Sequence, residues 1–327
     1  MSESLKIVDW NVNGIRASIK KGFFENVAGL EGDILCLQEI KCQDIDMEAV
    51  FGANQAADDA WQMSSNTPVS SLSSDSNLPG NDYLAFWHTC RIKKGYSGTA
   101  ILVKKELLER FDIKDSFTRL GLEELDSEGR IVGIELIAKS NPNQLITLIN
   151  GYYPQGGREG RVAFKIRFYQ QVYNLIRSLI ASGREVIITG DLNTTVKDID
   201  LARPKENRRT TGCLPQERVA LSWIIEPATF EPSQLMILNP EFTDYQNLLS
   251  SLNLIDTFRH FVPDENGHYT YWDQITRARD RNIGWRIDYF LITQGLLPSL
   301  QSSIIHNQVL GSDHCPISLG LVIQKLN

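Results

Sequence analysis

Polar side chains follow many of the short apolar runs in the sequence, at the points where those runs end. Asn11 follows KIVDW, Glu39 follows ILCLQ and Asp191 follows VIITG. The full set of such residues is Asn11, Asn13, Glu39, Tyr152, Asp191, Asn193, Asp288, Asp313 and His314. Because the ends of neighbouring strands can meet at one edge of a sheet, we expect these side chains to converge in a crevice there.

The types of these residues favour chemistry on a phosphate ester. Glu39 and Asn11 offer hard oxygen ligands for a cation that keeps several waters, which is typical of Mg²⁺, and no Cys/His cluster suggests zinc. Such a cation polarises a phosphoryl oxygen and stabilises the departing one. Asp191 could orient the attacking water or accept its proton, while Asn193 donates to the developing charge.

Two further residues complete this hypothesis. His314 can donate a hydrogen bond to a phosphate oxygen if a carboxylate such as Asp288 holds its ring in one orientation. Tyr152 adds another donor, or a phenolate, near the phosphorus.

Each residue taken singly also has a simpler interpretation. Glu39 could be a surface charge at a strand end, and Asp191 in GDLN could form a turn. Asp288 lies beside Arg286, which allows an ordinary ion pair, and His314 in DHCP could be a capping or buried histidine. The hypothesis therefore rests on six strand ends carrying such residues together.

The elements that position these residues are predicted mainly as strands. Runs rich in β-branched and aromatic residues predict strands at 5–12, 33–39, 82–89, 98–104, 130–136, 144–153, 185–191, 288–293 and 317–323. The clearest helical spacing runs from Val162 to Ile180, with weaker candidates at 216–225 and 242–252. Some strands are apolar throughout and others alternate, so two sheets packed face to face with helices outside would satisfy both patterns.

Composition sets limits on the class of protein. At 327 residues with 42% apolar residues, the chain can form one large domain, and we expect a single domain over 1–327. A Ser-rich stretch at about 55–82 is predicted to be an inserted surface loop. No signal sequence or membrane-length apolar run is evident, and the five cysteines are scattered without a CxxC pair. These features favour a cytoplasmic protein with no membrane association.

The formal net charge of -7 argues mildly against binding to nucleic acid by charge alone. Two stretches are nevertheless locally basic, RPKENRR at 203–209 and RARDRNIGWR at 277–286. Either could meet a phosphate backbone, although solvated loops are the simpler interpretation.

Read in chain order, the motifs resemble those of the exonuclease III family of AP endonucleases, within the endonuclease/exonuclease/phosphatase superfamily. They are WNVNGIRA (10–17), LQEIK (37–41), GYSGTAIL (95–102), EGR (128–130), NGYYPQGGR (150–158), GDLN (190–193), IDLARPKEN (199–207), NIGWRIDYFLIT (282–293) and GSDHCPI (311–317). LQE and SDH mark only the superfamily, whereas GWRIDYF, YTYW (269–272) and GSDHCP are typical of the DNA-repair branch. The resemblance extends from about Leu5 to Val322.

The resemblance implies an α/β fold, a four-layered sandwich of two packed mixed β-sheets flanked by helices (DNase I-like), with the site at one edge. It implies Mg²⁺-dependent hydrolysis of the phosphodiester 5′ to an abasic site, with Mn²⁺ as a substitute metal. It also implies 3′-5′ exonuclease and 3′-repair phosphodiesterase activity. The implied partner is double-stranded DNA with abasic sites or 3′-blocked ends, the implied state is a monomer, and the implied location is the cytoplasm, with the nucleoid in a bacterium.

Residue roles follow from the same resemblance. Tyr152, Asp191, Asn193 and the Asp288/His314 pair look like the catalytic machinery. Asn11 and Glu39 look like the main metal ligands. The full set implied at the metal is Asn11, Glu39, Asp191, Asn193, Asp313 and His314.

The resemblance also implies DNA contacts. Tyr271, Trp285 and Ile287 look like the wall of a pocket for a flipped-out sugar without its base, although aromatic residues pack into cores by default. Arg158 and Ile275 stand where relatives push side chains into DNA near the lesion. The full implied set is Arg130, Gln155, Arg158, Lys205, Asn207, Tyr271, Trp272, Ile275, Trp285 and Ile287.

Two positions depart from the family pattern. Asn13 stands where some relatives carry Asp, which disfavours a second tightly held metal, and Thr210 replaces an amide that some relatives carry.

Two rival hypotheses about the function also remain. One is a superfamily relative acting on a lipid head group or an inositol phosphate, which would usually carry a second histidine in place of Tyr152. The other is a DNA-binding protein without catalysis.

Overall fold

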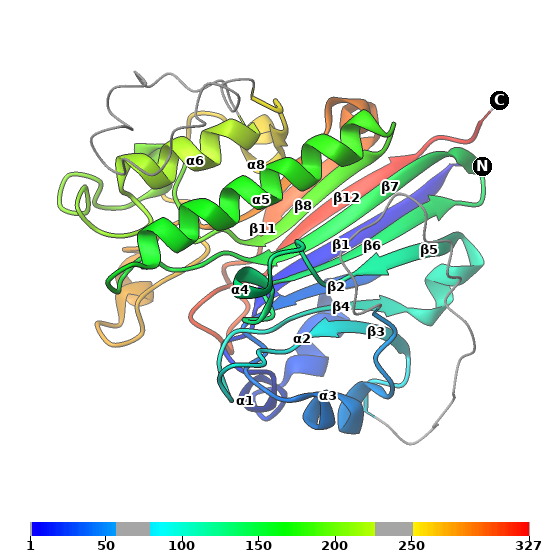
Figure 1. Ribbon diagram of the computed structural model, residues 1–327, viewed down its shortest axis with the longest axis horizontal. Coiled ribbons are helices and arrows are strands. Elements are labelled where there is room, and N and C mark those ends of the chain that lie inside the picture. Colours follow the sequence, from blue (N-terminus) through cyan, green and yellow to red (C-terminus); the bar gives the residue numbers. More distant parts are fainter. Residues whose placement is uncertain (1, 57–78, 226–250, 327) are drawn as a thin grey trace.

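The computed structural model describes residues 2–56, 79–225 and 251–326. Two six-stranded sheets lie face to face in the middle of the molecule, and helices cover their outer sides (Figure 1). The predicted α/β sandwich of two packed sheets flanked by helices is therefore confirmed.

The first sheet contains strands from both ends of the chain. Its order is β11 (Leu300–Ile305), β12 (Ile317–Ile323), β1 (Glu3–Asn11), β2 (Ile34–Gln38), β4 (Thr99–Lys104) and β3 (Tyr83–His88). β1 is parallel to β2 and antiparallel to β12, so the first and last strands of the chain are direct neighbours. The ends of β1 and β2 therefore lie at one edge, and the loop before β12 reaches the same edge.

The second sheet also has six strands, and it also contains a pair of parallel strands. Its order is β5 (Phe111–Phe117), β6 (Ile131–Ala138), β7 (Asn141–Tyr152), β8 (Glu185–Asp191), β10 (Asp288–Ile292) and β9 (Ile255–Asp256). β7 and β8 are parallel, and Tyr152 pairs in register with Asp191. β10 is antiparallel to β8, which places Asp288 opposite Asp191 at the same edge.

Helices cover the outer face of each sheet. α5 (Arg161–Ala181) and α6 (Pro215–Ile225) pack on the second sheet, whereas α1 (Ile15–Ile19), α2 (Phe23–Leu30) and α3 (Asp44–Phe51) pack on the first (Figure 1). Shorter helices are α4 (Glu123–Asp126), α8 (Thr257–Phe261), η1 (Lys105–Glu109), η2 (Asp198–Asp200), η4 (Ala278–Arg281) and η5 (Gln294–Ser299).

Successive side chains along each strand face opposite sides of the sheet, so the apolar residues form one cluster between the sheets and others under the helices. Ile7 and Cys36 of the first sheet face Leu148 and Ile187 of the second, within one apolar cluster between the sheets. Neighbouring residues point outward, such as Val8 toward α2 and Ile188 toward α5. Strands that bury both faces read as continuous apolar runs, which explains ILCLQ and VIITG.

All nine predicted strands are present, and the strong helix prediction at Val162 to Ile180 matches α5. The candidate at 216–225 matches α6, while the candidate at 242–252 lies almost wholly outside the described residues. Most of the predicted Ser-rich loop also lies outside them, so the insertion and the single-domain boundary stay predictions. Among the described residues, no helix has the length and apolar character needed to cross a membrane.

Three strands were not predicted. β5, FDIKDSF, has a register shift between Ile113 and Asp115, and β11, LQSSII, carries two serines and a glutamine. β9 has only two residues. None of these segments has a continuous apolar run or a clean alternation, so their sequences give little strand signal.

Candidate active site

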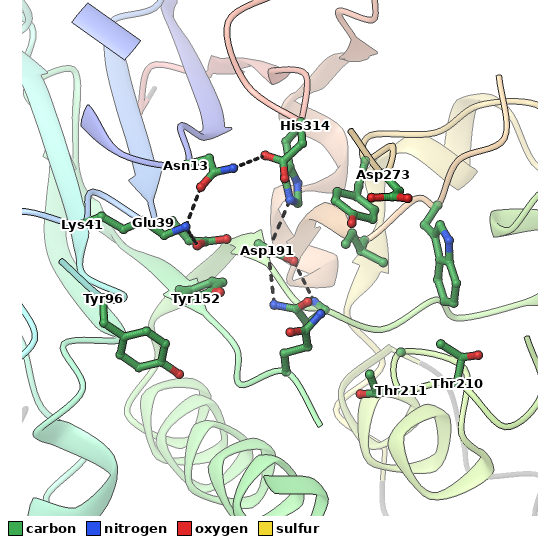
Figure 2. Close-up of a pocket in the computed structure, with 17 residues that line it drawn as sticks. Asn13, Glu39, Lys41, Tyr96, Tyr152, Asp191, Thr210, Thr211, Asp273 and His314 are labelled. Carbon is green, nitrogen blue, oxygen red and sulfur yellow. Dashed lines mark hydrogen bonds and ion pairs between the residues drawn. The ribbon is translucent and has the colours of Figure 1, made fainter. Parts of the chain in front are cut away.

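A cavity of about 440 Å³ opens at the edge of the sandwich where β2, β7 and β8 end. Figure 2 shows its lining, with Glu39, Tyr152, Asp191 and His314 around one centre. The predicted residues that line it are Glu39, Tyr152, Gln155, Asp191, Asn193, Tyr271, Trp285, Ile287, Asp313 and His314. Asn11 and Asp288 lie directly behind this lining, in contact with it.

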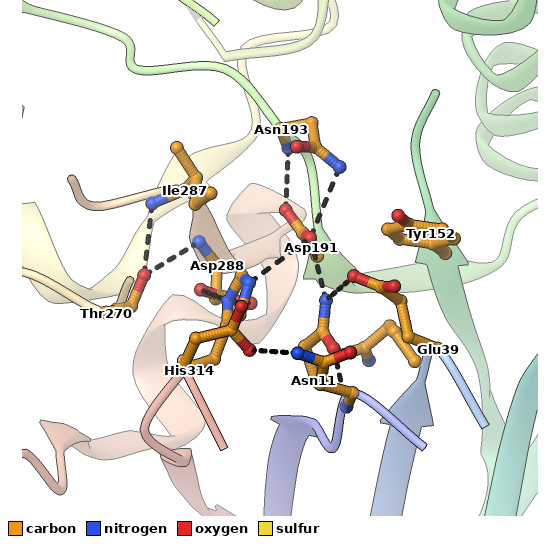
Figure 3. Close-up of polar contacts among 12 residues, drawn as sticks. Asn11, Glu39, Tyr152, Asp191, Asn193, Thr270, Ile287, Asp288 and His314 are labelled. Carbon is orange, nitrogen blue, oxygen red and sulfur yellow. Dashed lines mark hydrogen bonds and ion pairs between the residues drawn. The ribbon is translucent and has the colours of Figure 1, made fainter. Parts of the chain in front are cut away.

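Two carboxylates share one amide at the centre of the cavity. Asn11 Nδ2 donates to Glu39 Oε1 and to Asp191 Oδ2, each at 2.9 Å, which joins the first sheet to the second (Figure 3). Asn11 is fully buried, and the Glu39 side chain is only 16% exposed. Glu39 is therefore not a free surface charge, and the interpretation of it as one is wrong.

Asp191 is held by its own turn. The Asn193 main-chain N–H donates to Asp191 Oδ1 at 2.9 Å, and Asn193 Nδ2 donates to Asp191 Oδ2 at 3.2 Å. Burial raises the pKa of Asp191 to about 7, with His314 opposing the shift and the carboxylates of Asp288 and Glu39 adding to it. The carboxyl group can therefore exchange a proton near neutral pH.

The predicted donor role of Asn193 does not fit its contacts. Its Nδ2 also donates to the Tyr153 carbonyl at 2.9 Å, so both N–H bonds of the amide are used within the protein. Asn193 thus orients Asp191 rather than donating to a bound phosphate. The sequence could not show this, because the bond to Tyr153 links two strand ends 40 residues apart.

His314 and Asp288 form the predicted pair. His314 Nδ1 lies 2.9 Å from Asp288 Oδ2 and 3.1 Å from Oδ1, and both side chains are buried (Figure 3). Burial opposes the charge on His314, but Asp288 and Asp191 outweigh it and raise its pKa to about 10. The ring is therefore protonated, with Nε2 only 3.8 Å from Asp191 Oδ2.

The alternative ion pair for Asp288 is wrong. Arg286 points away from it, with Nε 2.7 Å from Asp200 Oδ1 and Nη2 2.6 Å from Asp256 Oδ2. Instead, the main-chain N–H of Asp288 donates to Thr270 Oγ1 at 3.2 Å, which fixes the start of β10 (Figure 3). The Asp288 carboxylate therefore pairs with His314.

Tyr152 lies at the end of β7 with its ring against Arg130, whose Cζ is 4.7 Å from the ring centroid. Burial raises the pKa of Tyr152 well above its usual value, and the carboxylates of Glu39 and Asp191 add to the shift while Arg130 opposes it. The hydroxyl therefore stays protonated near neutral pH. Of the two roles considered for Tyr152, this favours the hydrogen-bond donor over the phenolate.

Arg130 and Trp272 do not fit their predicted direct contacts with DNA. Arg130 is 1% exposed and donates to Glu128, the Tyr152 carbonyl and Tyr96 Oη. Trp272 is 2% exposed, with its indole N–H bonded to Asn282 Oδ1. Both side chains turn inward because they find buried partners, so they support the cavity instead of lining it.

The aromatic wall of the cavity is formed by neighbouring segments. Tyr271 pairs with both Trp285 and His314 through isolated β-bridges, and its ring lies 4.9 Å from the His314 ring. Ile287 is 6% exposed and lines the cavity beside them. These three predicted wall residues, Tyr271, Trp285 and Ile287, therefore lie on one side of the catalytic cluster.

The remaining residues that are predicted to contact DNA lie outside the cavity. Ile275 is 93% exposed on the loop after Trp272, held by a turn in which Asp273 accepts the Ile275 main-chain N–H. Arg158 and Lys205 are exposed, and Asn207 is partly exposed with its amide bonded to the Arg203 carbonyl. The structure does not bring these four side chains, Arg158, Lys205, Asn207 and Ile275, into the cavity.

Along one rim, Lys41 joins the predicted residues Asn13 and Asp313 in a polar chain, although the sequence did not mark Lys41 as a site residue. Lys41 Nζ contacts Glu39 Oε2 and Asn13 Oδ1, and Asn13 Nδ2 donates to Asp313 Oδ1 at 2.9 Å (Figure 2). The position of Lys41 within LQEIK, two residues after Glu39, was the available signal. Tyr96, Thr210, Thr211, Gly212 and Asp273 also line the cavity and were not predicted as site residues.

Backbone conformation also marks the site. Asn13, Glu39, Lys41 and Asn193 all have φ between 47° and 52°, in the left-handed region that residues other than glycine rarely adopt. All four line the cavity. Conformations of this kind persist where surrounding contacts over-determine them, and they cluster at functional sites.

The donor set fits a hard divalent cation. Oxygen atoms of Glu39 and Asp191 and a ring nitrogen of His314 lie within 4.8 Å of one another, but the protonated His314 ring has no lone pair for a metal, so its predicted place among the ligands does not fit. The two N–H bonds of Asn11 now stand between the carboxylates, where a cation would neutralise both. Half a turn of this amide would present its oxygen between the two carboxylates and so give three oxygen ligands, at the cost of the hydrogen bond that this oxygen now accepts from the Asn13 main-chain N–H.

The chain is similar in sequence to known nucleases. The profile of the Endonuclease/Exonuclease/phosphatase family matches residues 10–314. An exodeoxyribonuclease of Bacillus subtilis (strain 168) is 31% identical over 96% of this chain and 98% of its own length. The DNA repair nuclease APEX1 of Danio rerio is 32% identical over 98% of this chain and 83% of its own length.

Two solved structures have a similar overall fold. The catalytic domain of Xenopus laevis APE2 superposes with a TM-score of 0.71 at 25% identity, covering 99% of this chain and 94% of that one. The AP endonuclease LMAP of Leishmania major superposes with a TM-score of 0.73 at 24% identity, covering 98% and 88%. The second likeness concerns the fold alone.

Proposed function

Because the chain belongs to the endonuclease/exonuclease/phosphatase family, we propose that it hydrolyses the phosphodiester on the 5′ side of an abasic site in double-stranded DNA. The observation that carries the proposal is the placement of the Asp288–His314 pair, Asp191 and Glu39 beside an aromatic wall in one cavity. A phosphodiesterase needs the polar cluster, and selection of a damaged nucleotide needs the wall.

We propose Mg²⁺ as the metal, with Mn²⁺ as a substitute, held by Glu39, Asn11 and Asp191. Such an ion polarises a phosphoryl oxygen and stabilises the leaving one. Asn13 contributes no charge, and the ammonium of Lys41 already contacts Glu39, so the cluster favours one tightly held ion. Asp313 bonds to Asn13, which places it near the ion rather than among its first ligands.

Side chains of the protein carry out the proton transfer and stabilise the developing charge. Asp191, fixed by hydrogen bonds from Asn11 and Asn193, orients the attacking water and accepts its proton. His314 is kept protonated by Asp288, and its Nε2 donates to a non-bridging phosphate oxygen. Tyr152 donates its phenolic hydrogen from the opposite side of the cavity. Asn193 holds Asp191 in place through two hydrogen bonds.

The aromatic wall explains selection of the lesion. An abasic nucleotide has no base pair to break, so extruding it from the duplex costs little. The sugar would lie against Tyr271, Trp285 and Ile287, where a nucleotide with its base would meet the rings. Ile275, almost fully exposed on its turn, would enter the duplex beside the lesion, and Arg158 and Lys205 would contact the backbone.

The proposed substrates also include 3′-blocked ends, through 3′-5′ exonuclease and 3′-repair phosphodiesterase activity. A nucleotide at a 3′ end has no stacked neighbour on its 3′ side within its own strand, so extruding it into the same cavity costs less than extruding an internal nucleotide. We further propose that the protein works as a monomer in the cytoplasm, with the nucleoid in a bacterium.

The test is cleavage of a duplex oligonucleotide that carries one tetrahydrofuran abasic analogue, with Mg²⁺, with Mn²⁺ and with EDTA. An undamaged 3′-recessed duplex measures exonuclease activity in parallel. We expect metal-dependent incision directly 5′ to the analogue. No incision with either metal would contradict the proposal and direct attention to phosphomonoester substrates.

Glu39→Ala provides the matched variant. It removes a metal ligand while leaving the aromatic wall intact, so incision should fall at least about 100-fold. Binding to the abasic duplex in EDTA should stay within about twofold of wild type. Binding by the wild type without any incision would instead favour a DNA-binding protein without catalysis.

A further inference from the structure

A fully buried ion pair joins the two helices behind the cavity. Lys165 of α5 and Glu217 of α6 are 0% exposed, and Lys165 Nζ lies 3.0 Å from Glu217 Oε1. α5 and α6 pack side by side on the outer face of the second sheet (Figure 1). Burying two charges is costly, and such a pair stabilises a fold no better than apolar residues of the same size. The other contacts of the pair therefore indicate its role.

Lys165 reaches the catalytic turn. Its Nζ donates to the main-chain carbonyl of Asn193 at 2.7 Å. Asn193 has a φ of 52° and holds Asp191 through its main-chain and side-chain N–H groups. The ammonium of Lys165 thus anchors, from outside the cavity, the turn that orients Asp191.

Glu217 holds the side of the cavity formed by residues 210–212. Its carboxylate accepts from Thr211 Oγ1 at 2.7 Å and from the Gly212 main-chain N–H. Thr211 Oγ1 in turn accepts from the Gly156 N–H at 2.8 Å, which ties in the loop after β7. Figure 2 shows Thr210 and Thr211 across the cavity from Glu39. One carboxylate therefore fixes two segments of the rim.

Within residues 210–212, Gly212 packs tightly against Trp285 of the aromatic wall. A Cβ atom added to Gly212 would lie 3.0 Å from the Asn193 carbonyl oxygen and 3.4 Å from Trp285 Cζ3. Gly212 also has a φ of 87°, which disfavours any side chain. A shift of this segment by a few tenths of an ångström would therefore change the space beside Trp285.

We propose that the Lys165–Glu217 pair sets the width of the cavity and so determines its preference for a sugar without a base over an intact nucleotide. Both residues are positioning residues that act through Asn193, Thr211 and Gly212. This inference rests on the proposed function, because it concerns the selection of substrate at that site.

The test measures selectivity, defined as kcat/KM for incision at the tetrahydrofuran analogue divided by kcat/KM for the undamaged 3′-recessed duplex. Every partner of the Glu217 carboxylate is a donor, namely Lys165, Thr211, Gly212 and Leu214. Glu217→Gln keeps the size of the side chain but sets an NH₂ group against at least one donor. We expect selectivity to fall about tenfold, mainly through a higher KM for the abasic duplex.

Two further variants make the outcome decisive. Thr211→Val removes only the hydroxyl that links Glu217 to Gly156 and leaves no charge unpaired, so it should lower selectivity in the same direction even if Glu217→Gln fails to fold. Glu135→Gln is the control, because Glu135 pairs with Arg184 at the opposite end of β8 from the cavity and does not line the cavity. It should reduce thermal stability without changing selectivity.

Unchanged selectivity in folded Thr211→Val and Glu217→Gln would overturn the inference, as would an equal loss in Glu135→Gln. These outcomes are separate from failure of the proposed function, which would appear as absence of incision by the wild type.

Discussion

The Asp288–His314 pair predicts a pH-dependent stability that one substitution should reduce. His314 is buried, and Asp288 and Asp191 raise its pKa to about 10 in the folded protein. In the unfolded chain the pKa returns to about 6.5. Because the folded pKa is the higher one, the protonated histidine stabilises the fold fully below pH 6.5, and this stabilisation is lost as the pH rises through 10.

The magnitude follows from the two pKa values. One pKa unit corresponds to about 1.36 kcal/mol, so the free energy of unfolding should fall by about 3 kcal/mol between pH 6.5 and pH 9. Asp191 acts in the same direction, since its pKa is raised by burial from about 3.8 to about 7, but most of its effect is already lost at pH 6.5.

Urea unfolding in EDTA at the two pH values measures this loss without interference from a bound cation. Asp288→Asn removes the larger of the two carboxylate contributions to the His314 pKa and leaves that of Asp191, so the loss of stability between pH 6.5 and pH 9 should be clearly smaller than in the wild type. The dependence of the free energy of unfolding on urea should stay constant throughout. A wild type with equal stability at both pH values, or a variant that keeps the full pH dependence, would refute the pairing.

The remaining predictions concern Tyr152 and Ile275. Tyr152→Phe removes the phenolic donor, so kcat for incision should fall about 100-fold with little change in KM. Single-turnover and steady-state kinetics measure the two constants, and an unchanged kcat would exclude the donor role. Ile275 is 93% exposed, so Ile275→Ala should change the free energy of unfolding by less than about 0.5 kcal/mol. The same variant should weaken binding to the abasic duplex about tenfold in fluorescence anisotropy, and equal weakening on undamaged duplex would contradict a wedge at the lesion.

The sequence predicts the strands that bury two apolar faces, because those strands leave a continuous signal. ILCLQ and VIITG became β2 and β8 at the centre of the two sheets. LQSSII became β11 at a sheet edge, where partly exposed serines replace apolar residues, and it gave no signal. Edge strands have fewer neighbours to select their residues, so they are harder to predict.

The site shows a similar division. The motif positions predict which side chains meet, since Glu39, Asp191 and His314 do converge, but they do not show where a long side chain finds its partners. Arg130 turns inward to Glu128, and Asn193 uses its amide on Tyr153. The Lys165–Glu217 pair gave no signal, because a lysine and a glutamate on two helices usually face solvent.

The pairing of β1 with β12 also has a consequence for biosynthesis. The loop that carries His314 directly precedes β12, and β12 is held in the first sheet by β1, whose end carries Asn11. A nascent chain that has not yet released β12 from the ribosome therefore lacks both the closing strand and the histidine. The site can therefore assemble only after synthesis has passed His314 and β12.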